Sequence, residues 1–86
     1  MSERGEEIRV KRLQRISILE KSEELNFSVA MMCELGQLYY AENRVQEALN
    51  QFYKVLKMDE SNSIARSYIQ IIRGVLDFVN RVLLNP

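Results

Sequence analysis

Residues 44–58 read Arg-Val-Gln-Glu-Ala-Leu-Asn-Gln-Phe-Tyr-Lys-Val-Leu-Lys-Met, and this stretch decides the fold class. With 100° of rotation per residue, its main apolar positions fall within an arc of about 120°, as expected of an amphipathic helix with one buried side. These positions are Val45, Ala48, Leu49, Phe52, Val55 and Leu56. The stretch therefore predicts an α-helix that packs against the rest of the chain along one face.

The segment before it, residues 28–41, predicts a helix of a different kind. Its apolar residues surround almost the whole helical wheel, and Glu34 and Gln37 are the main interruptions. Ser28 is placed to act as its N-cap, and Asn43 is a residue type that adopts the left-handed conformation after a helix. Since a helix that is apolar on most sides must be covered on most sides, we expect it to be central.

A third helical segment follows the polar cluster Asp59-Glu60-Ser61-Asn62-Ser63, which is typical of a turn and a helix cap. From residue 63 to about residue 84, apolar residues occupy one half of the wheel and polar residues the other. Asn85-Pro86 is expected to end this helix. The pattern lasts about six turns, which makes the helix longer than the two before it.

Residues 6–25 are helical in composition but have no clear apolar stripe. Ile8, Val10, Leu13, Ile16, Ile18, Leu19 and Leu25 scatter around the wheel, so the sequence leaves open which face is buried. Three glycines and one proline, the last residue, leave few helix breakers among the 86 residues. We therefore predict a single all-α domain over residues 1–86, with about four helices.

The composition argues against several classes of function. The 12 basic and 12 acidic side chains cancel to a formal charge of +0, whereas nucleic-acid binders need a surplus of Lys and Arg. Without histidine, the chain lacks the commonest general base and the commonest metal ligand. Cys33, the one cysteine, lies in an apolar stretch that would raise its pKa, so we interpret it as a packed thiol. We expect no catalytic residue, no cofactor, no metal site and no nucleic-acid partner.

The N-terminal residues Met-Ser-Glu-Arg-Gly-Glu-Glu are charged where a signal peptide needs an apolar stretch. Apolar runs elsewhere are far shorter than the roughly 18 residues that a membrane-spanning helix needs. We therefore expect a cytoplasmic location without membrane contact, and a single reduced cysteine suits it.

Two helical segments joined by a tight turn prompt a search for repeats. Residues 29–62 match a 34-residue pattern, with Leu35-Gly36-x-x-Tyr39 in the first helix and Ala48-x-x-x-Phe52 in the second. This stretch resembles the tetratricopeptide repeat, in which small residues at the positions of Gly36 and Ala48 let the paired helices approach closely. The chain is similar to small single-repeat bacterial proteins of that family, which implies a short right-handed helical stack.

The resemblance has departures. Met32 stands where the motif prefers Trp, Asn43 where Gly is usual, and Glu60 where Pro usually ends the repeat. A second repeat begins after residue 63 but is not completed, because the helix continues to the end of the chain. The strong match covers about 34 residues and a weak match covers about 30 more.

Members of the family usually bind peptides in the groove lined by the first helices of successive repeats. The motif match implies that the groove-facing residues here are Ala30, Cys33, Gln37, Tyr40, Ala41, Ile64, Ser67 and Ile71. Because these positions are apolar or neutral, we expect no clamp for a carboxylate, and the groove suits an amphipathic helix or a hydrophobic strand. Alternatively, these residues are covered by the N-terminal helix of the same chain or by a second copy of the protein.

The last helix carries apolar residues about 15 Å beyond the length of an ordinary repeat helix. They are Val75, Leu76, Phe78, Val79, Val82 and Leu83. If roughly 400–600 Å² of this surface were uncovered, burying it would contribute on the order of 10 kcal/mol before the costs of association. The apolar face is too broad for a two-stranded coiled coil and suits a bundle of three or four helices.

We therefore predict a non-enzymatic protein–protein interaction or assembly module that self-associates through its C-terminal helix, most simply as a homodimer. The alternative is a monomeric adaptor. In it, the N-terminal helix folds over the C-terminal apolar stripe and leaves the groove free for a peptide.

Overall fold

Four long helices make up nearly all of the chain in the computed structural model, which describes residues 2–84 and the side-chain exposure of residues 4–83. They are α1 (Ser2–Lys21), α2 (Val29–Ala41), α3 (Val45–Met58) and α4 (Ser63–Val79). A short 3₁₀ turn, η1 (Leu25–Phe27), precedes α2, and a π-helical turn, η2 (Asn80–Leu84), extends α4. The described residues contain no strand, so the all-α prediction is confirmed.

The helix ends follow the local chemistry of the sequence. The Ser28 hydroxyl accepts a hydrogen bond from the Met31 backbone N–H at 3.1 Å, which confirms the predicted cap of α2. Asn43 has a φ of 62°, the left-handed conformation expected at the α2–α3 turn. Asn62 caps α4, because its Oδ1 accepts from the Ala65 N–H at 2.9 Å. The predicted end at Asn85-Pro86 lies outside the described residues.

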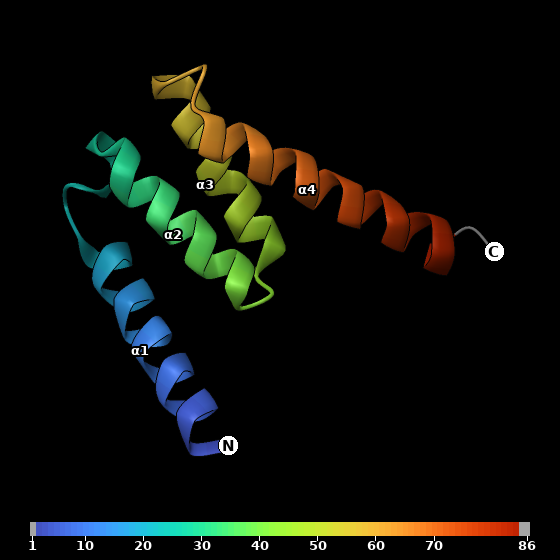
Figure 1. Ribbon diagram of the computed structural model, residues 1–86. Helices are drawn as coiled ribbons and strands as arrows, with labels where there is room; N and C mark the ends of the chain where they lie inside the picture. The colour runs from blue at the N-terminus through green and yellow to red at the C-terminus, as the bar shows by residue number, and fades with distance from the viewer. Residues whose placement is uncertain (1, 85–86) are drawn as a thin grey trace.

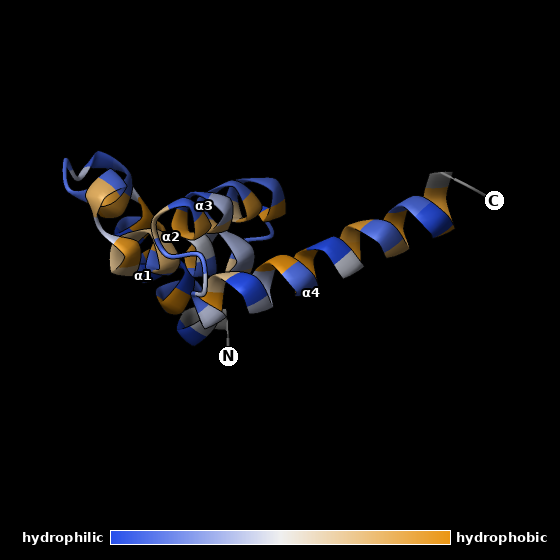
Figure 2. Ribbon diagram, turned by 90° about the horizontal axis from the view of Figure 1, so that it is seen from above, coloured by the Kyte–Doolittle hydropathy of each residue, from blue (hydrophilic) through white to orange (hydrophobic). Residues whose placement is uncertain are grey.

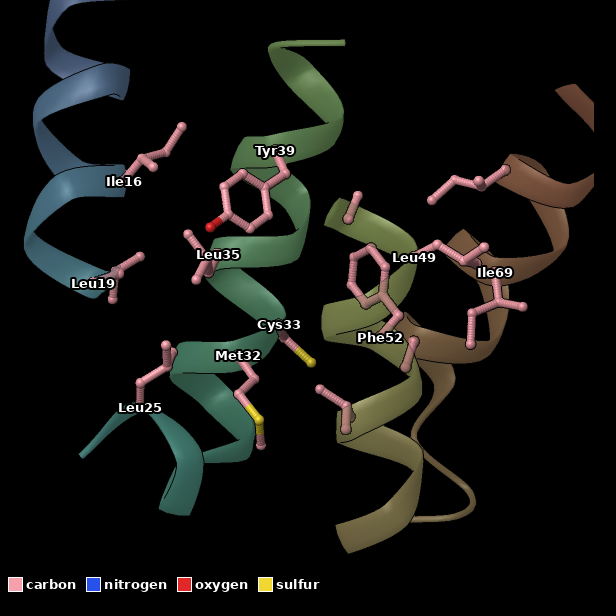
Figure 3. Packing of buried hydrophobic residues seen from close by; sticks show 14 residues of the cluster. Ile16, Leu19, Leu25, Met32, Cys33, Leu35, Tyr39, Leu49, Phe52 and Ile69 are labelled. Carbon is pink, nitrogen blue, oxygen red and sulfur yellow. The ribbon is translucent and has the colours of Figure 1, made fainter. Parts of the chain in front are cut away.

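The helix α2 lies at the centre of the core, between α1 and α3 (Figure 1). Its buried residues Met32, Leu35 and Tyr39 face the neighbouring helices in Figure 3. At Gly36, an added Cβ would lie 2.7 Å from Cζ of Phe52, a side chain that is fully buried. The predicted close approach of α2 and α3 is therefore confirmed, and the ring of Phe52 makes it.

The N-terminal helix begins earlier than predicted, at Ser2, and ends at Lys21. Of its apolar residues, Ile16 and Leu19 are buried against the core, whereas Ile8 and Ile18 are more than half exposed. Ion pairs supply the rest of its attachment to α2. Arg15 donates two hydrogen bonds to Glu34, at 2.7 and 2.8 Å, and both Arg9 and Arg12 bond to Glu42. This explains why no apolar stripe is visible in residues 6–25.

The position of α1 overturns one expectation. The helix packs on α2 and η1, while the C-terminal half of α4 extends away on the other side of the molecule (Figure 1). The predicted placement of the N-terminal helix over the C-terminal stripe is therefore wrong, whereas the monomeric adaptor itself stays a prediction. The physical reason is that α1 packs its buried residues on α2 and pairs its arginines with Glu34 of α2 and with Glu42, which directly follows α2.

The last helix runs past the end of its partner. Together α4 and η2 span residues 63–84, about 33 Å of helix, whereas α3 spans residues 45–58, about 21 Å. Ala65, Ile69 and Ile72 are buried against the core, and Leu76 is half-buried. Beyond Leu76, α3 offers no further surface, so the remaining turns project from the body (Figure 2).

Candidate functional site

An open hollow lies between α2 and the start of α4. It encloses about 650 Å³ and is largely apolar. Its lining residues are Val29, Ala30, Cys33, Glu34, Gln37, Leu38, Asn62 and Ile64. Outside the hollow, α2 and α4 meet at Tyr40 and Tyr68, whose rings pack edge to face with centroids 5.5 Å apart.

The thiol at the floor of the hollow is held in a neutral form. Cys33 is 5% exposed, and its Sγ lies 3.7 Å from Oδ1 of Asn62, to which the S–H donates. Burial raises the pKa of this thiol, and the negative charge of Asp59 raises it further. Because the thiolate is the reactive form, this cysteine is a poor nucleophile at neutral pH.

Four of the eight predicted groove residues line this hollow: Ala30, Cys33, Gln37 and Ile64. The other four lie elsewhere. Tyr40 is half-buried in its contact with Tyr68, and Ala41, Ser67 and Ile71 are exposed on α2 and α4 outside the hollow.

Four lining residues were not predicted, namely Val29, Glu34, Leu38 and Asn62. The helical spacing held a signal for two of them. Glu34 and Leu38 follow Ala30 at successive intervals of four residues, so the same helix face carries all three.

The apolar half of α4 divides into two rows. The first, here called the inner seam, consists of Ala65, Ile69, Ile72, Leu76 and Val79. Its first three residues are buried on the core, Leu76 is half-buried and Val79 is 39% exposed. The seam thus starts as ordinary helix–helix packing and loses its cover as α4 passes the end of α3.

The second row, here called the outer stripe, is exposed along its whole length. It consists of Ile64, Ile71, Val75 and Phe78, which fall within about 60° of one another on the helix. Their exposures are 44, 50, 42 and 66%. The stripe begins at the hollow, because Ile64 lines it, and runs along α4 to the last turn.

The turn η2 extends this exposed apolar surface. Val82 is 53% exposed and Leu83 is 70% exposed. In the projecting part of the helix, side chains of both rows are therefore exposed. Hydrophobic and hydrophilic segments alternate along this part of the ribbon (Figure 2).

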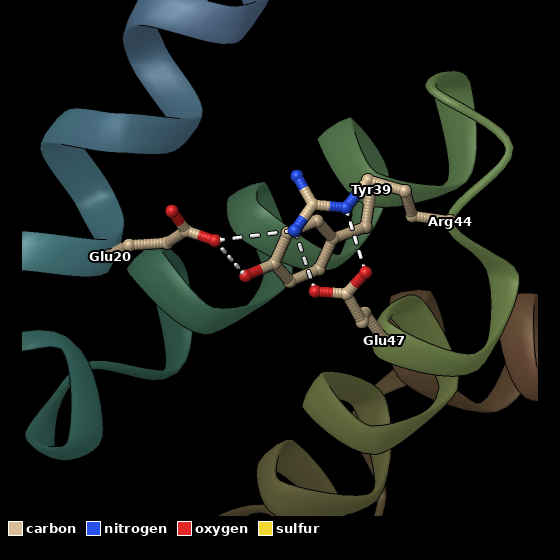
Figure 4. Close-up of polar contacts among 4 residues, drawn as sticks. All are labelled: Glu20, Tyr39, Arg44 and Glu47. Carbon is tan, nitrogen blue, oxygen red and sulfur yellow. Dashed lines mark hydrogen bonds and ion pairs between the residues drawn. The ribbon is translucent and has the colours of Figure 1, made fainter.

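A polar cluster ties α1, α2 and α3 together at the opposite side of α2 (Figure 4). The Tyr39 hydroxyl donates to Glu20 of α1, and the Arg44 guanidinium donates to both oxygens of Glu47, at 2.7 and 2.6 Å. Arg44 also lies over the ring of Tyr39, 4.5 Å from its centroid, and 3.6 Å from Glu20. Burial and the neighbouring Glu20 carboxylate raise the pKa of Tyr39, so its hydroxyl stays protonated. The cluster is suited to holding three helices together.

A second, shallower surface lies between α3 and α4. Tyr53, Leu56 and Ile69 form its apolar floor, and Arg66, Arg73 and Asp77 stand around it. Its charged residues are thus of both signs, two basic and one acidic.

Comparison of the chain with protein-family models, with curated proteins and with solved structures finds no match. The function of the chain is therefore inferred from the residues that form the surfaces described above.

Among residues 2–84, no helix combines the length and the apolarity that crossing a bilayer requires. In the same residues, no group of three or more His, Cys, Asp or Glu side chains is arranged to hold a metal ion.

Proposed function

We propose that this protein is a non-enzymatic assembly module that associates with a second copy of itself through the projecting end of α4. The observation that carries the proposal is the rise in exposure along the inner seam, from buried Ile72 to Val79 at 39% exposure, where α4 projects beyond α3. Val75, Leu76, Phe78, Val79, Val82 and Leu83 form the proposed contact surface.

The energetics support an association. The projecting turns expose aliphatic and aromatic side chains on two adjacent faces, and burial contributes about 25 cal/mol per Å². Loss of translational and rotational freedom and the ordering of side chains oppose this. A second copy supplies the same surface in the same conformation, which makes a symmetric dimer the simplest assembly.

We also propose that α2 and α3 form a tetratricopeptide-like unit. The contact of Gly36 with Phe52 and the buried Ala48 support this, since both are the close approaches that the motif resemblance implies. In this interpretation α4 takes the place of the first helix of a following repeat. A cytoplasmic location suits the buried free thiol of Cys33.

The test is the mass of the protein in solution before and after two substitutions. Light scattering at tens of micromolar is expected to give twice the mass of one chain. Val79→Asp combined with Leu83→Asp places two charges in the contact surface and is expected to give a single-chain mass, because an unpaired buried charge costs several kcal/mol. Helical content by circular dichroism should stay unchanged, since both residues are exposed in one copy.

The matched control adds the same two negative charges to the polar side of the same helix. Gln70→Asp with Asn80→Asp alters two exposed residues outside the apolar rows and should leave the dimer intact. A single-chain mass for the unmodified protein would refute the proposal. So would a dimer that survives Val79→Asp with Leu83→Asp.

The hollow favours a second candidate function, the binding of an amphipathic helix from another protein. Ala30, Cys33, Gln37 and Ile64 offer an apolar surface of a size that suits one helix face. This candidate predicts a monomer that binds such a peptide, and Ile64→Asp should then weaken binding without changing the mass.

A further inference from the structure

We propose that two copies pair their α4 helices antiparallel along the outer stripe, so that the projecting end of each α4 lies across the hollow of the other. This inference rests on the proposed self-association and specifies its geometry. A two-fold axis would cross the pair near residue 73, at the middle of the apolar surface that runs from Ile64 to Val82.

The direction of pairing is inferred from the helices that pack beside the N-terminal half of α4 and are missing beside its C-terminal half. The N-terminal half carries the body of the molecule, with α3 on the inner seam and α2 at the edge of the outer stripe. A two-fold axis parallel to the helices would set the two bodies on opposite sides of the pair and bring the projecting halves together, away from the hollows. A perpendicular axis instead places the C-terminal half of each α4 beside Ile64 and Ile71 of the other copy. Antiparallel alignment also opposes the two helix dipoles favourably.

The register follows from the length of the apolar surface. With the axis near residue 73, Ile64 lies opposite the partner's Val82, and Ile71 lies opposite the partner's Val75. Any large shift along the helix would leave one end of the stripe bare in both copies. This register also brings the end of the partner's helix over the hollow that Ile64 and Cys33 line.

The same arrangement covers the second exposed row. In each copy α2 lies beside the outer stripe on the side of the inner seam, as the contact of Tyr40 with Tyr68 shows. A two-fold axis perpendicular to both helices keeps that side common to the pair. Val79 of each copy therefore turns toward α2 of the partner, which explains why the projecting end of α4 is apolar on two faces.

The area agrees with a stable dimer. The exposed apolar side chains of α4 and η2 offer roughly 700 Å², close to the ~800 Å² per partner that stable interfaces commonly bury. The C-terminal turns alone offer about two thirds of this. A pairing of the tails only would therefore leave Ile64 and Ile71, at 44 and 50% exposure, unused.

Cysteine crosslinking tests the geometry. Cys33→Ser removes the native thiol and keeps a donor for Asn62. On this background, Ile64→Cys, Val82→Cys and the double variant are treated with a short bifunctional thiol reagent. Because the two positions lie about 27 Å apart within one helix, the reagent cannot join them in one copy.

The antiparallel pair predicts that the double variant becomes a covalent dimer and that no crosslinked product larger than a dimer forms. Each single variant should crosslink at least tenfold less. A protein that stays dimeric but crosslinks through Val82→Cys alone would overturn the antiparallel pairing and leave self-association standing. A dimeric double variant that does not crosslink would overturn it as well. A single-chain mass in light scattering would overturn both the pairing and the proposed function.

Discussion

Because Gly36 has no side chain, α2 and α3 can approach each other closely at this residue. A Cβ at this residue would lie 2.7 Å from the ring of Phe52, and that ring is fully buried and stacked on Tyr68 with centroids 4.9 Å apart. The ring has little room to move, so Gly36→Ala should overpack the α2–α3 contact. Overpacking costs about 1–3 kcal/mol, against a helix-propensity gain of about 1 kcal/mol for Ala. We expect urea denaturation to show a free energy of unfolding lower by up to about 2 kcal/mol.

Gly74 provides the matched control for that substitution. It lies in α4 with no atom within 4 Å of the position that a Cβ would take. Gly74→Ala should therefore raise the free energy of unfolding by up to about 1 kcal/mol at the same protein concentration. If Gly36→Ala were as stabilising as Gly74→Ala, the close approach of α2 to α3 would not be a constraint on this fold.

Individual residues also mark the limit of what the sequence predicts about the site. Ala30, Cys33, Gln37 and Ile64 were predicted to share a surface and do so, because helix periodicity places them on facing sides of α2 and α4. Asn62 was missed as a lining residue, since its place depends on the way the α3–α4 turn meets α2.

Gln51 was missed for a similar reason. It is 7% exposed, and its Oε1 has no hydrogen-bond partner within the described part of the chain. Residue type alone predicts an exposed glutamine, and its burial follows from how closely the neighbouring elements approach α3.

Among the helices, the accuracy of the prediction depended on how each is held. The helix α3 is buried along one face, so its apolar stripe was visible in the sequence and its bounds agree closely with the structure. The helix α1 is held by two buried side chains and several arginines, and such an attachment leaves no periodic signal. The long apolar face of α4 was predicted because every turn carries it.

The attachment of α1 through ion pairs makes this helix sensitive to acid. Hydrogen bonds from Arg15 lower the pKa of Glu34, and those from Arg12 and Arg9 lower the pKa of Glu42, from an ordinary value of 4.5. A carboxylate with a lowered pKa in the folded state stabilises it above the unfolded pKa and loses that contribution as the pH falls through the folded value. We therefore expect α1 to lose amide protection in hydrogen exchange below about pH 4.5, before α2 and α3 do.

Substitution of one ion-pair partner should reproduce this effect at neutral pH. Glu34→Gln removes the charge that Arg15 contacts and should speed exchange in α1 at pH 7, whereas Glu23→Gln changes an exposed carboxylate and should not. Equal loss of protection in all four helices on acidification would mean that α1 is not an independently attached element.

The molecule as a whole is thin and extended for its length. Its radius of gyration is 14.5 Å, and its principal extents are 43 × 40 × 19 Å. A closed globule of this length would have a radius of gyration of about 12 Å. The excess comes from α1 and α4, which extend away from the α2–α3 pair in different directions (Figure 1). A chain of this shape buries less apolar surface than its length allows, so we expect its stability to depend on association.

That dependence predicts a melting temperature that rises with protein concentration. If folding and dimerisation are coupled, each tenfold increase in concentration adds about 1.4 kcal/mol to the folded dimer, which corresponds to a rise of about 3–5 °C. Scanning calorimetry or thermal circular dichroism over two decades of concentration would measure it. The variant with Val79→Asp and Leu83→Asp should melt at a lower temperature that no longer depends on concentration, because its monomer has nothing left to associate. A melting temperature of the unmodified protein that stays constant over that range would mean that the α4 surface contributes nothing to holding the fold together.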